Sequence, residues 1–512
     1  MKKRMIINWL MAWALMATGA AAQTEMQIPV QQFSLDNGLT FLVVERPTAP
    51  VFSGYICVSV GSAHEINGNI GTAHLLEHMM FKGSQNIGTT DYESEKVLMA
   101  KEDSVWAKID EARRQLPYLK INYPDKVAEQ EKYIESLQMI LDSLAEASSQ
   151  YVVQNEFDGI YTRHGAAEFN ASTGYDHTNY YVSLPSNRLE LWFAMESDRL
   201  KNPAFREFFT ERSVVSEERR LSVENNPDTK LYEQVIGTAY MAHPYKIFWE
   251  WQSEVNNLTR QDLENFFRKY YIPQEMTVAI VGNVKLAEVK RLAEKYFGDI
   301  PRGTLPEPIY TEEPPQTGER RIDVNYESSP ALYIAFHKTA FDSPEEPVFQ
   351  IIQRLLGDGR TSRLYKALVL DKQTCLDISV GEFPGGELGS EDPGLFLIFA
   401  YPKEGVSTAE VEKGVYEELE KLAATPVDEK ELTKIKNRID ADFIWGLQSN
   451  IGLAGRLAST HLQAQDWQYL LSFRDKLKQV TADDIMATAK KYLIKENRTV
   501  ATLIPKISGE GK

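Results

Sequence analysis

Two histidines and a glutamate lie close together in the sequence at a spacing that suits metal chemistry. In the segment His74-Leu75-Leu76-Glu77-His78, the two histidines are four residues apart. On a helix, residues i and i+4 share a face, so both imidazoles can chelate one zinc ion. Glu77 falls near the same face and can reach a water molecule on the metal. The pattern H-x-x-E-H is the reverse of the commoner zinc-binding motif H-E-x-x-H. The alternative is an amphipathic helix whose His and Glu side chains face solvent.

A catalytic zinc site takes three protein ligands and keeps one position open. The third ligand should therefore be a His, Asp or Glu from another element. Glu211 and Glu218 are candidates, because seven residues make nearly two helical turns and place both carboxylates on one face. One of them could bind the metal while the other supports a ligand. An exposed acidic helix without any role at a metal is the alternative.

The composition is that of a folded, acidic protein. The chain has 512 residues, 43% of them hydrophobic, and a formal net charge of -17. These values argue against a disordered chain, and the acidity argues against nucleic acid as a partner, because phosphate binding needs a basic surface. Cys57 and Cys375 are far apart in sequence and fit no metal or haem spacing, so we expect two buried free thiols, with a disulfide as the alternative.

The N-terminus has the features of a secretory signal peptide. Lys2-Lys3-Arg4 precedes an apolar run from Met5 to Met16, and Ala20-Ala21-Ala22 offers a cleavage site. We therefore expect residues 1–22 to be removed and the protein to be exported, to the periplasm or, alternatively, out of the cell. An uncleaved anchor is the other interpretation. No later stretch approaches ~18 apolar residues, so the sequence predicts no integral membrane span after cleavage.

An internal repeat predicts two related halves. Adding 222 to the numbers of residues 258–279 gives residues 480–501, and Thr, Asp, Lys, Tyr, Ile, Thr, Val and Ala recur in register. Each copy predicts a capped helix followed by a strand. The proline-rich residues 300–320 should form an extended linker between halves at 27–299 and 321–507. Strands grouped before helices indicate an α+β fold with duplicated layers.

The first half is longer because of an insert at about residues 101–150. It is rich in Glu, Lys, Ala, Leu and Gln, with a break at Asn122-Tyr123-Pro124. This pattern predicts an antiparallel helical hairpin. It could be a solvated decoration, a lid or an arm that docks a partner.

The sequence resembles the pitrilysin/insulinase family of zinc metallopeptidases, the inverted zincins. It is most similar to the short branch that includes the mitochondrial processing peptidase and bacterial relatives. The resemblance covers nearly the whole mature chain and rests on residues 74–84, Asn170-Ala171-Ser172-Thr173, the helix from Glu211 to Glu218, His243-Pro244-Tyr245 and Ser362-Arg363-Leu364-Tyr365.

The resemblance implies roles for these residues. It makes His74, His78 and Glu218 the ligands of a single zinc ion per chain and Glu77 the general base.

It also implies a supporting carboxylate at Glu211 and a strand at Asn170 and Ala171 against which a peptide substrate lies. The implied activity is that of an endopeptidase on short or unfolded peptides, held in an enclosed chamber as two halves close like a clamshell.

Two departures from the family pattern leave another reading open. The gap from His78 to Glu218 is longer than is usual for the family, and the insert at about residues 101–150 accounts for it. The second half has no H-x-x-E-H near Phe349–Gln353, so one metal site per chain is expected. The other departure is that no match appears to the Arg and Tyr that the family commonly places after the helix at Ser362–Leu370. The chain could therefore be a non-catalytic or partner-dependent subunit that binds peptides, as a homodimer or with a related motif-less subunit. A zinc hydrolase acting on a non-peptide substrate is a third reading.

Overall fold

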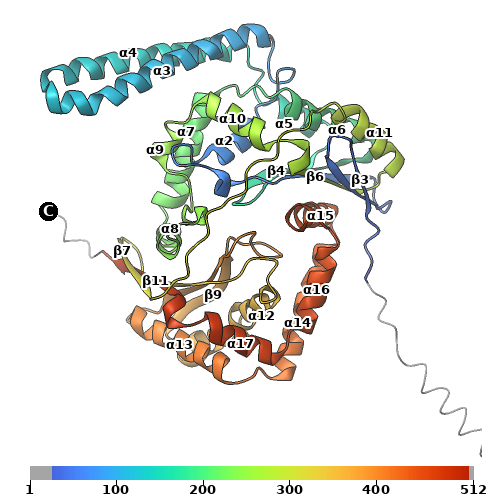
Figure 1. Ribbon diagram of the computed structural model, residues 1–512, viewed down its shortest axis with the longest axis vertical. Helices are drawn as coiled ribbons and strands as arrows, with labels where there is room; N and C mark the ends of the chain where they lie inside the picture. Colours follow the sequence, from blue (N-terminus) through green and yellow to red (C-terminus); the bar gives the residue numbers. More distant parts are fainter. Residues whose placement is uncertain (1–25, 507–512) are drawn as a thin grey trace, which may run out of the picture. The chain divides into compact units, whose positions relative to one another are not determined.

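The structure is a computed structural model of the chain and describes residues 26–506 (Figure 1). The predicted signal peptide, residues 1–22, lies outside the described residues. None of the helices within residues 26–506 is long and apolar enough to cross a membrane. Both cysteines are buried and free, as the sequence predicts.

The first half is a six-stranded mixed sheet with helices. Its strand order is β1-β2-β6-β3-β5-β4, in which β2 and β6 are parallel and the other pairs antiparallel. The elements are β1 (Gln31–Ser34), β2 (Thr40–Glu45), β3 (Val51–Val58), α2 (Thr72–Met79), α3 (Tyr92–Asn122), α4 (Val127–Ser149), α5 (Glu156–Arg163), β4 (Ala167–Thr173), β5 (Thr178–Pro185), α6 (Leu189–Lys201), α7 (Phe208–Arg219), α8 (Pro227–Ala239), α9 (Gln252–Val255), α10 (Arg260–Tyr270), β6 (Met276–Gly282) and α11 (Leu286–Phe297).

The second half is a five-stranded mixed sheet with helices. Its order is β7-β11-β8-β10-β9, in which β7 and β11 are parallel. The elements are β7 (Arg320–Tyr326), β8 (Ala331–His337), α12 (Glu346–Gly357), a π-helical segment (Tyr365–Asp371), β9 (Cys375–Phe383), β10 (Leu395–Pro402), α13 (Thr408–Ala424), α14 (Glu429–Gly446), α15 (Asn450–Ala464), α16 (Tyr469–Gln479), α17 (Ala482–Tyr492) and β11 (Arg498–Pro505).

The two halves repeat one topology, which confirms the α+β fold with duplicated halves. The order β2-β6-β3-β5-β4 in the first sheet matches β7-β11-β8-β10-β9 in the second, with the same parallel pair. The helices before β6 and β11 start with the same capping box, Thr259 with Asp262 and Thr481 with Asp484. In each box the threonine accepts from the aspartate N–H while the aspartate accepts from the threonine N–H.

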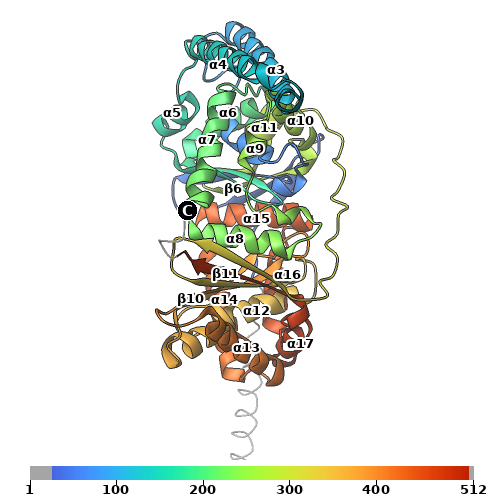
Figure 2. The same cartoon turned by 90° about the vertical axis from the view of Figure 1, so that its left-hand side faces the viewer.

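The two halves exchange one helix each. Helix α8 of the first half packs on β7, β8 and β11, and α15 of the second half packs on β3 and β6 (Figures 1 and 2). One buried cluster contains side chains from both halves, among them Val235 and Tyr240 with Tyr333 and Leu397. The halves therefore cannot separate like a clamshell without exposing this shared core to water.

The predicted helical hairpin is formed by α3 and α4. Helix α3 starts at Tyr92, earlier than the expected insert, and the turn lies at Tyr123, where the sequence places the break. The two helices pack on each other around Trp106, Ile109, Leu137 and Leu141.

Candidate metal centre

Helix α2 presents the two histidines, and a glutamate from the preceding loop fixes its start. The helix begins after Gly71, which has φ 97°, a left-handed conformation that favours glycine. The carboxylate of Glu65 accepts hydrogen bonds from the N–H groups of Gly71 (2.9 Å) and Ala73 (2.7 Å). Burial raises the pKa of Glu65 to about 8, and the hydrogen bonds from these N–H groups act in the opposite direction by stabilising the charged form. Sequence reasoning missed Glu65, because no capping pattern covers a side chain six or eight residues before the N–H groups it binds.

The structure brings His74, His78 and Glu218 together. The Oε2 atom of Glu218 lies 3.7 Å from Nε2 of His74 and 3.6 Å from Nε2 of His78. One donor atom from each residue falls within 4.8 Å of the others. The histidines come from α2 and the glutamate from α7, so two helices far apart in sequence supply the three donors.

These three side chains fit a zinc ion. A tetrahedral ion with bonds of ~2.0–2.1 Å separates its ligand atoms by about 3.3 Å, so the observed 3.6 and 3.7 Å require only a small inward movement. Two imidazoles and one carboxylate leave a fourth position open, as catalytic zinc sites do. The side chain of Glu218 is 40% exposed, which leaves that position accessible to solvent and substrate.

Two further carboxylates hold the histidines in place. Glu250 lies with Oε1 2.9 Å from Nδ1 of His74, and Glu211 lies with Oε2 3.4 Å from Nδ1 of His78. Each leaves the Nε2 atom of its histidine free to face Glu218. Such outer carboxylates fix the tautomer and orientation of a ligating imidazole. The family resemblance implied Glu211 as a supporting carboxylate, but no sequence pattern indicated Glu250, which is 176 residues from His74.

The local charges shift the pKa values of these groups. Burial opposes protonation of His74, but the hydrogen bond and negative charge of Glu250 outweigh it and raise the pKa of His74 to about 9. Burial would raise the pKa of Glu211, yet hydrogen bonds with His78 and Lys82 hold that pKa below its usual value. The ammonium group of Lys82 lies 2.6 Å from Oε1 of Glu211. Glu211 is therefore an ionised group between a histidine and a lysine.

Glu77 is held beside the three candidate metal ligands by a hydrogen bond from strand β4. Its Oε2 atom accepts a hydrogen bond of 2.6 Å from the hydroxyl of Thr173 at the end of β4. This fixes one carboxylate oxygen and orients the side chain. The family resemblance implied substrate contact for Asn170 and Ala171, and the contact of Thr173 with Glu77 was not anticipated.

Strand β4 carries Asn170 and Ala171 at the edge of the first sheet, where it pairs only with β5. The N–H of Ala171 is bonded to the side-chain oxygen of Asn170 at 2.9 Å. A cavity of about 370 Å³ lies beside the strand and is lined by Glu77, His78, Phe81, Lys82, Asn155, Asp158, Phe169, Asn170 and Glu211. An edge strand next to a cavity can accept an extended peptide by strand addition.

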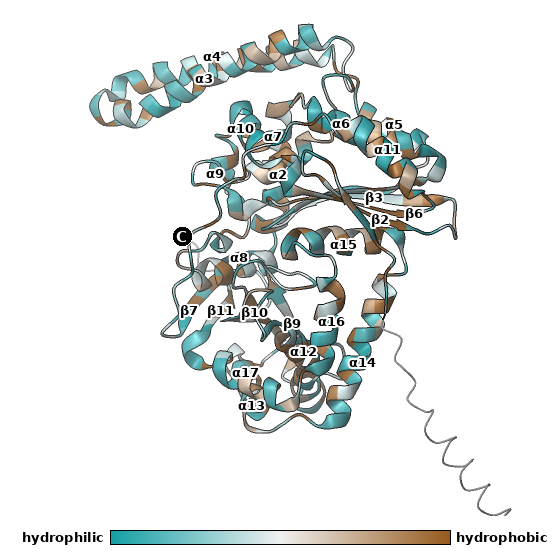
Figure 3. Ribbon diagram, turned by 45° about the vertical axis from the view of Figure 1, so that its right-hand side comes forward, coloured by the Kyte–Doolittle hydropathy of each residue, from teal (hydrophilic) through white to brown (hydrophobic). Residues whose placement is uncertain are grey.

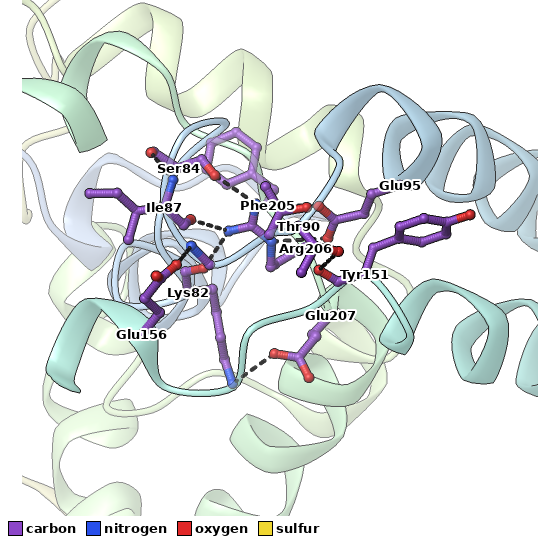
Figure 4. Close-up of polar contacts among 12 residues, drawn as sticks. Lys82, Ser84, Ile87, Thr90, Glu95, Tyr151, Glu156, Phe205, Arg206 and Glu207 are labelled. Carbon is purple, nitrogen blue, oxygen red and sulfur yellow. Dashed lines mark hydrogen bonds and ion pairs between the residues drawn. The ribbon is translucent and has the colours of Figure 1, made fainter. Parts of the chain in front are cut away.

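A buried arginine ties the end of the motif to the start of α7. Figure 4 shows the guanidinium of Arg206 enclosed by the loop from Lys82 to Ile87. It donates to the carbonyls of Lys82 (2.6 Å), Ser84 (2.6 Å) and Ile87 (2.9 Å) and to the carboxylate of Glu95 (2.9 Å). This network fixes the backbone that follows α2 relative to the helix that bears Glu211 and Glu218.

The second half has helices equivalent to those that carry the candidate metal ligands, but with different side chains at the ligand positions. Helix α12 follows β8 as α2 follows β3, and its Gln350, Gln353 and Arg354 repeat the spacing of H-x-x-E-H. Arg354 pairs at 3.2 Å with Asp442 of α14, the counterpart of α7. Within residues 26–506, one group of His, Cys, Asp and Glu side chains has metal-binding geometry, and it lies in the first half.

Two family profiles match the chain. The profile described as insulinase (peptidase family M16) matches residues 40–105 and 129–248, and the M16 inactive domain matches residues 257–439. Together they cover more than half of the chain.

Individual relatives agree with these matches. The zinc protease PqqE of Helicobacter pylori is 26% identical over 504 residues, covering 96% of each chain. The mitochondrial-processing peptidase subunit beta of Saccharomyces cerevisiae is 22% identical and covers 93% of this chain and 91% of that protein. Among solved structures, a protease from H. pylori superposes with a TM-score of 0.75 at 25% identity, covering 94% of this chain and all of that one. The periplasmic protease PqqL of Escherichia coli gives 0.66 at 16% identity, and here the match covers 95% of this chain but 48% of that one.

Proposed function

Because this chain belongs to the insulinase family of peptidases, M16, we propose that it is a zinc-dependent endopeptidase that hydrolyses short or unfolded peptides. The observation that carries the proposal is the convergence of His74, His78 and Glu218 next to Glu77, which Thr173 orients. A related zinc protease supports the choice of metal. One ion per chain agrees with the single group of metal-binding geometry within residues 26–506.

The residues divide the work of peptide hydrolysis among them. His74, His78 and Glu218 would hold the ion, which would supply Lewis-acid polarisation of the scissile carbonyl and would lower the pKa of a water molecule toward ~7. A carboxylate oxygen of Glu77 accepts the proton of the attacking water and then donates it to the leaving amine nitrogen. Glu211 and Glu250 keep the two imidazoles in the tautomer that presents Nε2.

The substrate lies along the edge of β4. An extended peptide adds as a further strand beside Asn170 and Ala171, which aligns one of its peptide bonds with Glu77. The cavity of about 370 Å³ beside the strand receives the side chain next to the scissile bond. Its apolar wall, Phe81 and Phe169, suits a large side chain.

The test is a cleavage assay that compares the wild type, with and without zinc, with one variant. Purified protein is analysed for metal content and incubated with a peptide library, and products are read by mass spectrometry. Glu77→Gln should keep its zinc and lose cleavage, because it cannot accept the proton. A Glu77→Gln variant that still turns over peptides would remove Glu77 from the mechanism, and peptide cleavage by zinc-free protein would remove the metal.

Two observations favour the second candidate, a peptidase that needs a partner chain. The halves share a buried core and exchange α8 and α15, so opening them to form the chamber would expose that core to water. The match with PqqL covers about half of that longer chain. A chamber formed between two chains, as a homodimer or with a motif-less subunit that supplies the missing Arg and Tyr, would satisfy both. Activity that falls on dilution and returns on addition of the partner would distinguish this candidate from a self-sufficient enzyme.

We also propose that the chain is exported after removal of residues 1–22, with the periplasm as its compartment. The halves would then extend over residues 27–299 and 321–507, joined by the linker at 300–320. N-terminal sequencing of protein from a cell fraction tests cleavage and compartment together.

A further inference from the structure

We propose that the tip of the helical hairpin docks on an anionic phospholipid surface. The tip surface comprises Tyr118, Lys120, Ile121, Tyr123 and Lys126, at the turn between α3 and α4. This inference is independent of the peptidase proposal, because it concerns where the protein is held and not what it cleaves.

The tip exposes large apolar side chains to water. Ile121 is 80% exposed, more than any other large hydrophobic residue within residues 26–506, and Tyr118 and Tyr123 are 59% and 46% exposed. The two tyrosine rings lie 6.0 Å apart, so these side chains form one patch. Most of the remaining hairpin surface is hydrophilic (Figure 3). An exposed cluster of this kind on a polar element marks a surface that binds something.

The hairpin does not need these side chains for its own packing. Its buried contacts lie nearer the base, where Trp106 packs with Leu137. The base is held rigidly by two arginines of the first half. Arg260 donates to Glu102 at 2.9 Å, and the guanidinium of Arg212 lies 3.9 Å from the ring centre of Trp106. Helix α3 has 31 residues and is about 45 Å long. The tip therefore lies at the end of a long arm whose base is anchored by these contacts.

The charge of the tip selects an anionic surface. At the tip, Lys120 and Lys126 outnumber the one acidic residue, Asp125, whereas the whole chain has a net charge of -17. Tyrosine and lysine together are typical of the membrane interface, where the ring sits at the headgroups and the ammonium reaches the phosphates. Cationic side chains add electrostatic attraction to anionic lipids. The Nζ atom of Lys126 lies 5.1 Å from the ring centre of Tyr123, so the two features coincide.

The tip also lies apart from the part of the chain that the family profile describes. The insulinase profile matches residues 40–105 and resumes at residue 129, so the tip falls within the unmatched segment. The base of the hairpin contacts α7, the helix that bears Glu211 and Glu218, through Arg212. Docking of the tip would therefore fix the orientation of the candidate metal centre relative to the lipid surface.

Vesicle flotation tests the proposal. The full chain is mixed with vesicles of phosphatidylcholine alone or of phosphatidylcholine with phosphatidylglycerol. Ile121→Glu and the charge reversal Lys120→Glu/Lys126→Glu are compared with Met139→Glu, a control on α4 that is 63% exposed and away from the tip. The wild type and all variants are prepared with the same N-terminal residues, so any difference in vesicle binding between them is due to the hairpin alone. Circular dichroism checks that each variant is folded.

We expect the wild type and Met139→Glu to float with the anionic vesicles and not with the neutral ones. Both tip variants should bind at least about tenfold more weakly, and salt should weaken wild-type binding. Failure of the wild type to float with anionic vesicles would overturn the proposal. Flotation of Ile121→Glu equal to that of the wild type would also overturn it. Loss of self-association or of a protein partner in the tip variants, without any vesicle binding by the wild type, would assign the patch to protein contact instead.

Discussion

Glu250 offers the sharpest test of how the candidate metal centre is built. It touches no substrate, and its carboxylate lies 2.9 Å from Nδ1 of His74 and is almost fully buried. Glu250→Gln keeps the shape of the side chain and removes its charge. We expect zinc affinity to fall about 10- to 100-fold, or roughly 1.4–2.7 kcal/mol, because the imidazole loses the negative charge that raises its basicity.

The geometry also predicts an order of effects. Glu211 is farther from its histidine, at 3.4 Å, and shares its charge with Lys82 at 2.6 Å. Glu211→Gln should therefore weaken zinc binding less than Glu250→Gln. Glu217→Gln is the matched control, since Glu217 is on the same helix as Glu211 but is exposed and pairs with Arg220.

Competition with a chromophoric chelator measures these affinities, and peptide cleavage at saturating zinc measures what activity remains. The expected pattern is a large loss for Glu250→Gln, a smaller one for Glu211→Gln and none for Glu217→Gln. Wild-type zinc affinity in Glu250→Gln would refute the reasoning, because the short contact with His74 would then have no energetic consequence. A larger loss of zinc affinity in Glu211→Gln than in Glu250→Gln would refute the argument from distance.

Three further predictions concern residues around the site and the core. Thr173→Val should lower kcat about tenfold or more with zinc content unchanged, because Glu77 loses the hydroxyl that orients it; an unchanged kcat would deny that role. Burial lowers the pKa of His64 to about 4 from its usual 6.5, so the unfolded chain binds a proton that the folded chain does not. Its share of stability is complete above about pH 6.5 and falls by roughly 2–3 kcal/mol toward pH 4, and urea unfolding of His64→Gln should show a weaker loss in that window. Arg206→Met should destabilise the protein by about 3–5 kcal/mol, since it leaves buried Glu95 without its cation, and adding Glu95→Gln should recover part of the loss in thermal unfolding.

Local patterns and the internal repeat allowed much of the fold to be predicted. The capping residues Thr259 and Thr481 are set by short-range hydrogen bonds, and the recurrence of their surroundings at an offset of 222 residues anticipated the duplicated topology. The exchange of α8 and α15 could not be foreseen, because an amphipathic pattern gives the apolar face of a helix but not the sheet that covers it.

The residues of the candidate site could likewise be predicted from the sequence only in part. His74 and His78 are one helical turn apart, so their common face follows from spacing alone. Glu218 became a specific candidate through the family pattern. The contacts of Glu250 and Thr173 join segments far apart in the chain, and a carboxylate or hydroxyl in a loop or at the end of a strand has no periodicity that would indicate its partner.

The exchange of α8 and α15 explains why the first half, which has the metal motif, needs the second half, which lacks it. Leu42, Val44 and Val281 of the first sheet are fully buried, yet they are not among the residues of the first core between the sheet and its own helices. Helix α15 covers the opposite face, against β3 and β6 (Figure 1). Exposing these three side chains would cost about 4.5–9 kcal/mol at ~1.5–3 kcal/mol each, comparable with the whole stability of many domains, ~5–15 kcal/mol. The second half thus contributes to the metal centre through the sheet that supports it, although it has no H-x-x-E-H of its own.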